Sequence, residues 1–348
     1  MEYGLPGAAK NTGDESRLHS IPSLAAVAAQ RHNRSILRHP ETRIMFDPPQ
    51  AIPTEIFCRV PDALRRSGPR PAWFDTRPFA STHSFLEGPA FDRAGNLYCV
   101  DMPYGRIFKI APDGTFAVAA EYDGWPNGLR IHKDGRIFIA DRKRGLMVMD
   151  KAGREPVCLF EGPDGARFLG LNDLNFAPNG DLYFTDQGDN GLENPNGAVY
   201  CLRADGRLER LIGNLPGPNG LTLNADGSAL YLNVSRANAV WSIALPKEGG
   251  AKRVSLFLQL SGSTGGPDGL ALTADGGLAV AHSGLGTVWI FSREGEPRYR
   301  VRSCAELRTT NLAFGGPDRT TLYITESHSG SILRAQVPVA GQSLYSHA

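Results

Sequence analysis

The sequence has no long hydrophobic run and almost no net charge. No stretch of about 18 consecutive apolar residues occurs in the 348-residue chain, so we expect no transmembrane helix. The 37 Lys and Arg residues nearly balance the 36 Asp and Glu residues, which gives a formal net charge of +1. Because so neutral a chain has no overall field to attract nucleic acid or an anionic membrane, we expect neither partner.

Cysteine is scarce, and its spacing argues against a disulfide framework. The five cysteines lie far apart, form no C-x-x-C pair, and in several cases occupy apolar strand-like segments such as GNLYCVD. An odd number of cysteines cannot all pair within one chain. The N-terminal residues also lack the basic-then-apolar order of a secretory signal. We therefore expect buried free thiols and a soluble cytoplasmic protein of unknown oligomeric state.

What the sequence does contain is a repeated phrase. A polar residue precedes an apolar run, a turn follows, and a second apolar run completes the phrase, as in PNGLTLNADGSALYLN. The phrase occurs six times at intervals of roughly 40 to 49 residues, the period expected for four short strands per repeat. The leading polar residues are Glu87, Asn127, Asn172, Asn219, Asp268 and Asn311.

Each repeat predicts a four-stranded antiparallel blade. The two apolar runs are joined by turns such as PNGD (178–181), where Asn-Gly supplies the positive φ angles of a tight hairpin. A third strand and a more variable outer strand follow in most repeats. Because one blade cannot bury both of its faces, six blades should stack around an axis. The predicted fold is therefore all-β, a six-bladed β-propeller.

The remaining segments define the predicted boundaries. Residues 1–50 form a polar N-terminal extension, partly flexible, with one helix-prone stretch, SLAAVAAQRH; residues 51–340 form the propeller, and 341–348 a C-terminal tail. The last repeat has little room for an outer strand, whereas the β-prone segment 53–61 lies unused before the first blade. We expect this N-terminal strand to pair with the last blade and close the ring, because closure protects exposed strand edges.

The six leading polar residues should converge near one end of the central channel, because the innermost strand of each blade lines it. All six carry carboxylate or carboxamide oxygens, which suit Ca²⁺ or Mg²⁺. The alternative is that each Asn or Asp only bonds backbone at a turn before a Gly. Their common phase in the repeats favours a metal or substrate site.

A second set of polar residues ends the second strand of most blades. We expect most of them to bond loop backbone at the other end of the blade or to support neighbouring turns. His282 and His328 are the histidines expected near the channel, and a His–Asp proton shuttle is an alternative there. The members of this second set are Asp101, Asp141, Asp186, His282 and Glu326.

The blade openings LEGP, LNDL, PNGL and PDGL, with the closing TTNLAFGGPDRTTLYITES, resemble the SMP-30/gluconolactonase/LRE-like family over roughly residues 53–337. The resemblance implies a six-bladed propeller that acts as a lactonase or related hydrolase. It also implies one catalytic divalent ion, usually Ca²⁺ and sometimes Zn²⁺. The implied ligands are Glu87, Asn172, Asn219 and Asp268.

One position departs from the family pattern. Members that act on sugar lactones carry an Arg two residues before the Asn of the ND motif, and this chain has Gly170 there. The sugar-binding pattern is therefore incomplete, although Arg167 lies close in sequence.

The leading interpretation is a hydrolase that opens a lactone or a similar cyclic ester, with a small molecule as its substrate. Asp268 would serve as general base as well as ligand. Mg²⁺ and Mn²⁺ are alternatives to Ca²⁺ and Zn²⁺. A phosphotriester or epoxide hydrolase on the same metal site, and a non-catalytic propeller scaffold, remain alternative functions. Contacts to the substrate or to the ligands are assigned to Asn127, Asn311, His282 and His328.

Overall fold

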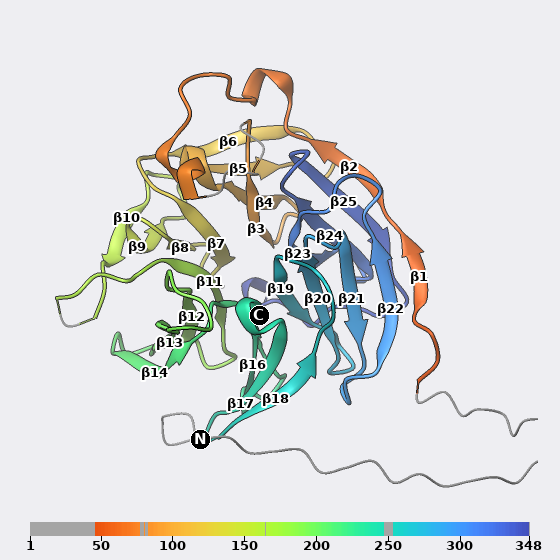
Figure 1. Cartoon of the computed structure of the whole chain (residues 1–348). Helices are drawn as coiled ribbons and strands as arrows, with labels where there is room; N and C mark the ends of the chain where they lie inside the picture. The colour runs from red at the N-terminus through yellow and green to blue at the C-terminus, as the bar shows by residue number, and fades with distance from the viewer. Residues whose placement is uncertain (1–45, 77–79, 81–82, 164, 247–252, 348) are drawn as a thin grey trace, which may run out of the picture. The chain divides into compact units, whose positions relative to one another are not determined.

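The computed structural model describes residues 46–76, 80, 83–163, 165–246 and 253–347, and the helix-prone stretch SLAAVAAQRH lies outside these residues. The described strands form six sheets arranged in a ring (Figure 1). The fold is a six-bladed β-propeller, as the repeats predict. Helical structure in the described residues is confined to short 3₁₀ segments, and none of them is long and apolar enough to cross a membrane.

Blades 1 to 4 each contain four consecutive strands with antiparallel neighbours. The first strand of each blade contacts the first strand of the next blade all the way round, so these strands wall a central channel. Blade 1 contains β3 (Leu86–Phe91), β4 (Leu97–Asp101), β5 (Arg106–Ile110) and β6 (Phe116–Glu121); blade 2 contains β7 (Pro126–Ile131), β8 (Ile137–Asp141), β9 (Gly145–Met149) and β10 (Val157–Phe160). Blade 3 contains β11 (Leu171–Phe176), β12 (Leu182–Asp186), β13 (Gly197–Leu202) and β14 (Leu208–Leu215); blade 4 contains β15 (Pro218–Leu223), β16 (Ala229–Val234), β17 (Ala239–Ala244) and β18 (Arg253–Gln259).

The N-terminal residues complete the last two blades. Strand β2 (Glu55–Arg59) pairs antiparallel with β25 and supplies the outer strand of blade 6, as the sequence predicts. Strand β1 (Gln50–Pro53) pairs in parallel with β22 on the outside of blade 5, which the repeats do not predict (Figure 1). Blade 5 contains β19 (Gly266–Leu272), β20 (Leu278–Ser283), β21 (Thr287–Phe291) and β22 (Pro297–Arg302); blade 6 contains β23 (Thr309–Gly315), β24 (Thr321–Glu326) and β25 (Ser331–Gln336).

The hydrophobic core lies between successive blades. Val100 and Ile107 of blade 1, for example, belong to one buried cluster with Leu129 and Ile139 of blade 2. The first strands of blades 1 and 4 are buried along their whole length, whereas the outer strand β10 is largely exposed. Each blade therefore buries both faces only when its neighbours are present, which explains why six blades fold as one ring.

The hairpin turns use one left-handed residue rather than two. In the turn 178–181, Gly180 has φ +91°, whereas Asn179 is not among the residues with positive φ. Gly180 N donates to Ala177 O, and Ala177 N donates to Asp181 O. The prediction that both Asn and Gly would adopt positive φ is wrong, because the turn tightens around the glycine alone.

The cysteines are free, but they are not all buried. Cys99 and Cys201 are buried in strands, whereas Cys158 and Cys304 are exposed and Cys58 is half-buried. The expectation of free thiols is confirmed, and the expectation of general burial is wrong. Cys158 lies on the outer strand β10, where Val157, Cys158 and Leu159 are all exposed.

A segment that we call the strap, residues 341–347, crosses the axis at one end of the channel. Gly341 N donates to Arg319 O of blade 6, and Gln342 N donates to Leu272 O of blade 5. The segment ends in the 3₁₀ turn η5 (Tyr345–His347), where Tyr345 stacks on Phe176 of blade 3. The strap and the later halves of the six inner strands enclose a cavity of about 440 Å³.

Candidate functional site

The six aligned polar residues, which we call the polar ring, all lie near the start of an inner strand. They therefore occupy the end of the channel opposite the strap, which we call the ring end. Five are buried, and Asp268 is half-buried. Each inner strand has a β-bulge at this level, and bulges re-aim side chains next to functional sites. The bulges lie between Glu87/Ala90, Pro126/Gly128, Leu171/Leu174, Pro218/Leu221, Pro267/Leu270 and Thr309/Asn311.

The glycines after the polar-ring residues allow adjacent blades to approach closely. A Cβ atom at Gly88 would lie 2.5 Å from Asn127 O, and one at Gly220 would lie 2.5 Å from Asp268 O. Any side chain at these positions would push adjacent inner strands apart. The polar-Gly pairs lie inside strands, so the alternative interpretation of turn residues is wrong for them.

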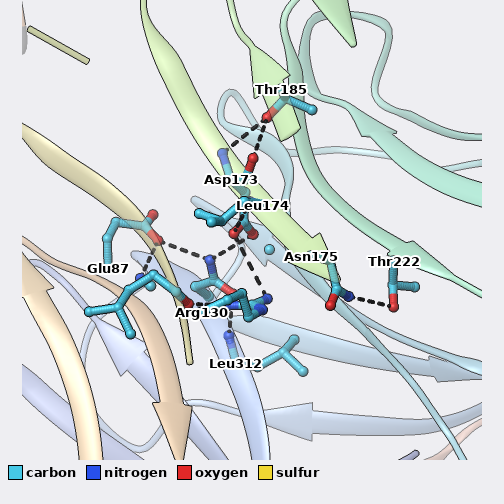
Figure 2. Close-up of polar contacts among 12 residues, drawn as sticks. Glu87, Arg130, Asp173, Leu174, Asn175, Thr185, Thr222 and Leu312 are labelled. Carbon is cyan, nitrogen blue, oxygen red and sulfur yellow. Dashed lines mark hydrogen bonds and ion pairs between the residues drawn. The ribbon is translucent and has the colours of Figure 1, made fainter. Parts of the chain in front are cut away.

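A hydrogen-bonded network crosses the channel within this ring. Asn311 Nδ2 of blade 6 lies 3.1 Å from Glu87 Oε2 of blade 1 and 3.2 Å from Asp173 Oδ2 of blade 3. Blades 6 and 3 lie on opposite sides of the axis, so the channel is narrow at this level. Figure 2 shows Glu87 and Arg130 pointing toward Asp173, and Arg130 NH2 lies 3.8 Å from Asp173 Oδ1.

Three carboxylates influence one another in this network. Burial raises the pKa of Glu87 well above its usual range, and the negative charges of Asp268 and Asp173 raise it further. Burial also raises the pKa of Asp173, whereas Arg130 acts in the opposite direction. Like charges held close together in a buried site favour either protonation or a bound cation. The electrostatics thus suit a positively charged ligand.

The hydrogen bonds divide the polar ring into satisfied and open groups. Asn311 is fully used, because its Nδ2 donates to two carboxylates and its Oδ1 accepts from Leu312 N. Asn219 uses only its Nδ2, which donates to Ser235 Oγ. Within the described part of the chain, the carboxamides of Asn127 and Asn172 form no hydrogen bond, although each is only 5% exposed.

These open oxygens fit a divalent cation. Asn172 and Asn219 offer carboxamide oxygens, and Glu87 has Oε1 left over, because Gly88 N and Asn311 both donate to Oε2. Among the described residues, the fully buried side-chain atoms without a partner are Asn233 Oδ1 and Arg300 Nε, so the unbonded carboxamides of Asn127 and Asn172 remain accessible to a small ligand. The described residues contain no group of three or more His, Cys, Asp or Glu side chains with metal-binding geometry. A site here would therefore need its carboxamides.

Second-strand residues fix the backbone of the polar ring. Thr185 Oγ1 of blade 3 donates to Asn219 O of blade 4 at 2.8 Å, and Asn233 Nδ2 of blade 4 donates to Asp268 O of blade 5 at 2.6 Å. Blades 3 and 4 thereby each hold the inner strand of the next blade. At a bulge the backbone hydrogen bonds between strands are interrupted. These side-chain contacts therefore help to position the polar-ring side chains.

The second polar set is structural, but its expected location needs a correction. Asp101 pairs with Leu86, so it lies at the ring end and not at the other end of the blade. Its Oδ1 accepts from Phe85 N, and Asp186 accepts from the amides of Leu169 and Gly170. These two carboxylates hold the segments that lead into the inner strands of blades 1 and 3. The alternative expectation, that they support neighbouring turns, describes them correctly; Asp141 and Glu326 also accept backbone amides.

The two candidate histidines occupy different environments. Trp289 Nε1 donates to Nδ1 of the fully buried His282, so the ring proton is on Nε2, which faces Asn238 Oδ1 at 3.1 Å. His282 is thus held between a tryptophan and a carboxamide. His328 is exposed in the β24–β25 turn. Burial lowers the pKa of His83, a ring-end histidine that the sequence analysis missed, and the charges of Arg65 and His328 lower it further.

Sequence reasoning also missed Asp173 and Arg130. Both break the pattern of their strands: Asp173 stands where several other blades have Gly, and Arg130 is a cation inside the inner strand PNGLRI. A charged residue in a segment that is otherwise buried was the signal available. Arg167, noted for its nearness to Gly170, is exposed and pairs with Glu161 at 3.2 Å.

Comparisons with known proteins agree with this architecture. Residues 85–328 match the model of the SMP-30/gluconolactonase/LRE-like region. A gluconolactonase of Zymomonas mobilis is 30% identical over 289 residues, which cover 72% of this chain and 78% of that protein. Diisopropyl-fluorophosphatase of Loligo vulgaris is 26% identical over 287 residues, covering 74% of this chain and 91% of that protein.

A solved structure shares the fold. The calcium-binding protein regucalcin from Agrobacterium tumefaciens superposes with a TM-score of 0.70 at 21% identity. The match covers 86% of this chain and all of that protein, 100% of its length.

Proposed function

The chain belongs to the SMP-30/gluconolactonase/LRE-like family, and from this premise we propose that it is a metal-dependent hydrolase that opens a lactone or a similar cyclic ester. The observation that carries the proposal is the set of open oxygens at the ring end. Carboxamides that have no protein partner and stay accessible, beside buried carboxylates that repel one another, favour a bound cation.

The residues proposed to hold the ion are Glu87, Asn172, Asn219 and Asp268. All four offer oxygen, which favours Ca²⁺, and the regucalcin structure is described as calcium-binding. When bound, a divalent ion supplies Lewis-acid polarisation of the substrate carbonyl.

The chain's own residues supply the proton transfer and the positioning. Asp268 is the half-buried carboxylate of the polar ring, and we assign it the role of accepting a proton from the attacking water. Asn127 has no hydrogen-bond partner among the described residues, so its Nδ2 is assigned to the substrate. Asn311 holds the carboxylates of Glu87 and Asp173 in fixed orientations.

A second candidate function is hydrolysis of a phosphotriester-type substrate. The specific observation that favours it is the similarity to diisopropyl-fluorophosphatase, which extends over 91% of that protein. The same oxygen set could serve either reaction, because fold and metal do not determine the substrate.

A substrate panel assayed with and without chelator tests the proposal. The panel contains sugar lactones, aliphatic lactones and one phosphotriester such as paraoxon. We expect lactone hydrolysis that chelator abolishes and that Ca²⁺, Zn²⁺, Mg²⁺ or Mn²⁺ restores to different extents. Hydrolysis of the phosphotriester alone would favour the second function, and lactone turnover that resists exhaustive chelation would overturn the metal requirement.

A further inference from the structure

At Gly170, where this chain departs from the family pattern, an arginine from another blade occupies the nearby space. A Cβ atom at Gly170 would lie 2.8 Å from Arg142 Cζ and 2.9 Å from Arg142 NH1. Arg142 follows β8 in blade 2, whereas Gly170 precedes β11 in blade 3. The guanidinium of one blade thus occupies the space that a side chain of the next blade would take. Gly170 is two residues before Asn172, directly before the inner strand of blade 3.

Neutral groups hold the Arg142 guanidinium in this position. NH1 donates to Gln187 Oε1 at 3.0 Å, and NH2 donates to Gly188 O at 3.3 Å. The Arg142 amide is also fixed, because it donates to Trp125 O at 2.9 Å. Two hydrogen bonds to uncharged oxygens orient the fork without neutralising its charge.

A second arginine packs its aliphatic stem near the next ligand position. Arg236, in the 3₁₀ turn η4 (Ser235–Ala237), lies over Gly217, which is two residues before Asn219. A Cβ atom at Gly217 would lie 2.9 Å from Arg236 Cγ. Arg236 is exposed, whereas Arg142 is half-buried.

The carboxylates near the two arginines also accept hydrogen bonds from other groups. Burial lowers the pKa of Arg142, and the charges of Asp186 and Asp189 oppose that effect. The oxygens of Asp186 also accept the amides of Leu169, Gly170 and Gly188. Asp189 accepts from Asn196 Nδ2, and Glu193 accepts from Gly191 N. Arg142 lies at Gly170 and Arg236 lies beside Gly217, and an anionic group that reached both side chains would accept directional hydrogen bonds from their guanidiniums.

We infer that Arg142 and Arg236 recognise a negatively charged group on the substrate, so that the preferred substrate is a lactone that also carries a carboxylate. This inference rests on the proposed function, because it assigns the substrate class of the same site. The carboxylate would lie over Gly170 and Gly217, while the lactone carbonyl lies deeper, at the polar ring. An arginine fork binds a carboxylate with directional hydrogen bonds, which a neutral hydroxymethyl group cannot replace.

The test compares two substrates that differ in one group. The γ-lactones of gluconic acid and glucaric acid share a ring, but the second carries a carboxylate in place of the terminal hydroxymethyl group. We expect the wild-type protein to have the higher kcat/KM for the glucaric lactone. Arg142→Met and Arg236→Met should each lower that kcat/KM by about tenfold to a hundredfold, mainly through KM, with a much smaller effect on the gluconic lactone.

Three further variants make the comparison specific. Arg142→Lys should recover part of the loss, because the charge remains but the fork does not. Gly170→Ala should also weaken the preference, because the new methyl group displaces the guanidinium while every charge is kept. Arg167→Met is the matched control, since this arginine is exposed and paired with Glu161, and it should leave the preference unchanged. Thermal melting confirms that each variant folds.

A binding measurement separates failure of this inference from failure of the proposed function. Calorimetric titration with glucarate and with the neutral hexitol sorbitol requires no turnover. If neither lactone is hydrolysed, the hydrolase proposal fails, and glucarate binding that is lost in Arg142→Met still supports the arginine site. The inference is overturned if both Met variants keep the wild-type ratio between the lactones, or if wild type and Arg142→Met bind glucarate equally.

Discussion

At the scale of single residues, Asn311 organises the ring end. Its Nδ2 contacts Glu87 Oε2 and Asp173 Oδ2, and its Oδ1 accepts from Leu312 N. A neutral carboxamide that donates to two carboxylates can hold them close together. Two ionised carboxylates cannot hold each other in this way, because neither has a proton to donate. Glu87 and Asp268 can therefore be distinguished by experiment, because Glu87 is held in this network and Asp268 is half-buried.

The first prediction compares Glu87→Gln with Asp268→Asn. Each change removes one negative charge from the proposed ion site and should weaken metal binding. Saturating metal should restore much of the Glu87→Gln activity, whereas Asp268→Asn also loses the proton acceptor and should stay about 10²–10⁴ slower in kcat. Calorimetry gives the metal affinity of each variant, and kcat is measured at saturating metal. Full recovery of the Asp268 variant would show that Asp268 is a ligand only.

The second prediction concerns His282 and acid stability. Burial lowers the pKa of His282 below its usual 6.5, and protonation of Nδ1 would break the bond from Trp289 Nε1. Below pH 6.5 the unfolded chain binds a proton that the folded protein resists, so stability falls as the pH decreases toward the folded pKa. Replacing His282 with Gln should flatten this part of the curve of melting temperature against pH.

The matching histidine control uses His83, whose pKa is also lowered and whose contribution has the same sign. His83→Gln should remove only the part of the pH dependence of melting temperature that His83 causes. The remaining pH dependence should disappear in the double variant His83→Gln/His282→Gln. A His282→Gln curve parallel to that of the wild type from pH 7 to pH 5 would contradict the assignment of His282 as a buried neutral residue.

At the scale of elements, the sequence predicts strands that repeat and misses strands that do not. The segment 53–61 was recognised as a spare strand because the last repeat lacks its outer strand, and β2 fills that place on β25. The parallel pairing of β1 with β22 has no counterpart in the other blades, so no periodicity announces it. Thr54 joins the two strands, and its Oγ1 donates to Arg302 O at 2.8 Å.

The third prediction follows from this closure. A chain that begins at residue 50 keeps β1 and β2 and should melt close to the full-length protein. A chain that begins at residue 61 exposes the edges of β22 and β25 and should melt about 10 °C lower or associate, because it loses two paired strands. Melting curves and size-exclusion profiles at equal concentration compare them. Identical behaviour of the two truncations would rule out closure by the N-terminal strands.

At the scale of the whole molecule, the sequence predicts the ring but not the contacts across it. The common phase of the six phrases places one polar residue on each inner strand, because period and register are properties of a single blade. The bond between Asn311 and Asp173 crosses the axis, and Arg142 reaches from one blade to the next. Such contacts depend on how long side chains meet between blades, and no repeat pattern encodes that.

The strap is the other whole-molecule feature without a repeat signal. It contacts blades far apart in the sequence: Arg93 Nε of blade 1 donates to Ser346 O, and Tyr345 OH lies 3.4 Å from His132 Nε2 of blade 2. Tyr345 also stacks on Phe176 of blade 3, with ring centroids 4.9 Å apart. A single segment thereby ties several blades together below the cavity of about 440 Å³.

The fourth prediction is that the strap stabilises the ring without taking part in chemistry. A chain that ends at Gly341 loses the contacts of Tyr345 and Ser346 and opens the cavity to solvent, so its melting temperature should fall by several degrees. Amide exchange should accelerate in β7 and β11, whose later residues line that cavity. Because the polar ring lies at the opposite end, kcat measured well below the melting temperature should stay within about twofold of wild type.

Ser343→Ala, at an exposed strap position, is the control and should change none of these quantities. Unchanged exchange in β7 and β11 would show that the strap only covers the channel, and a large fall in kcat at low temperature would show that the two ends of the channel are coupled.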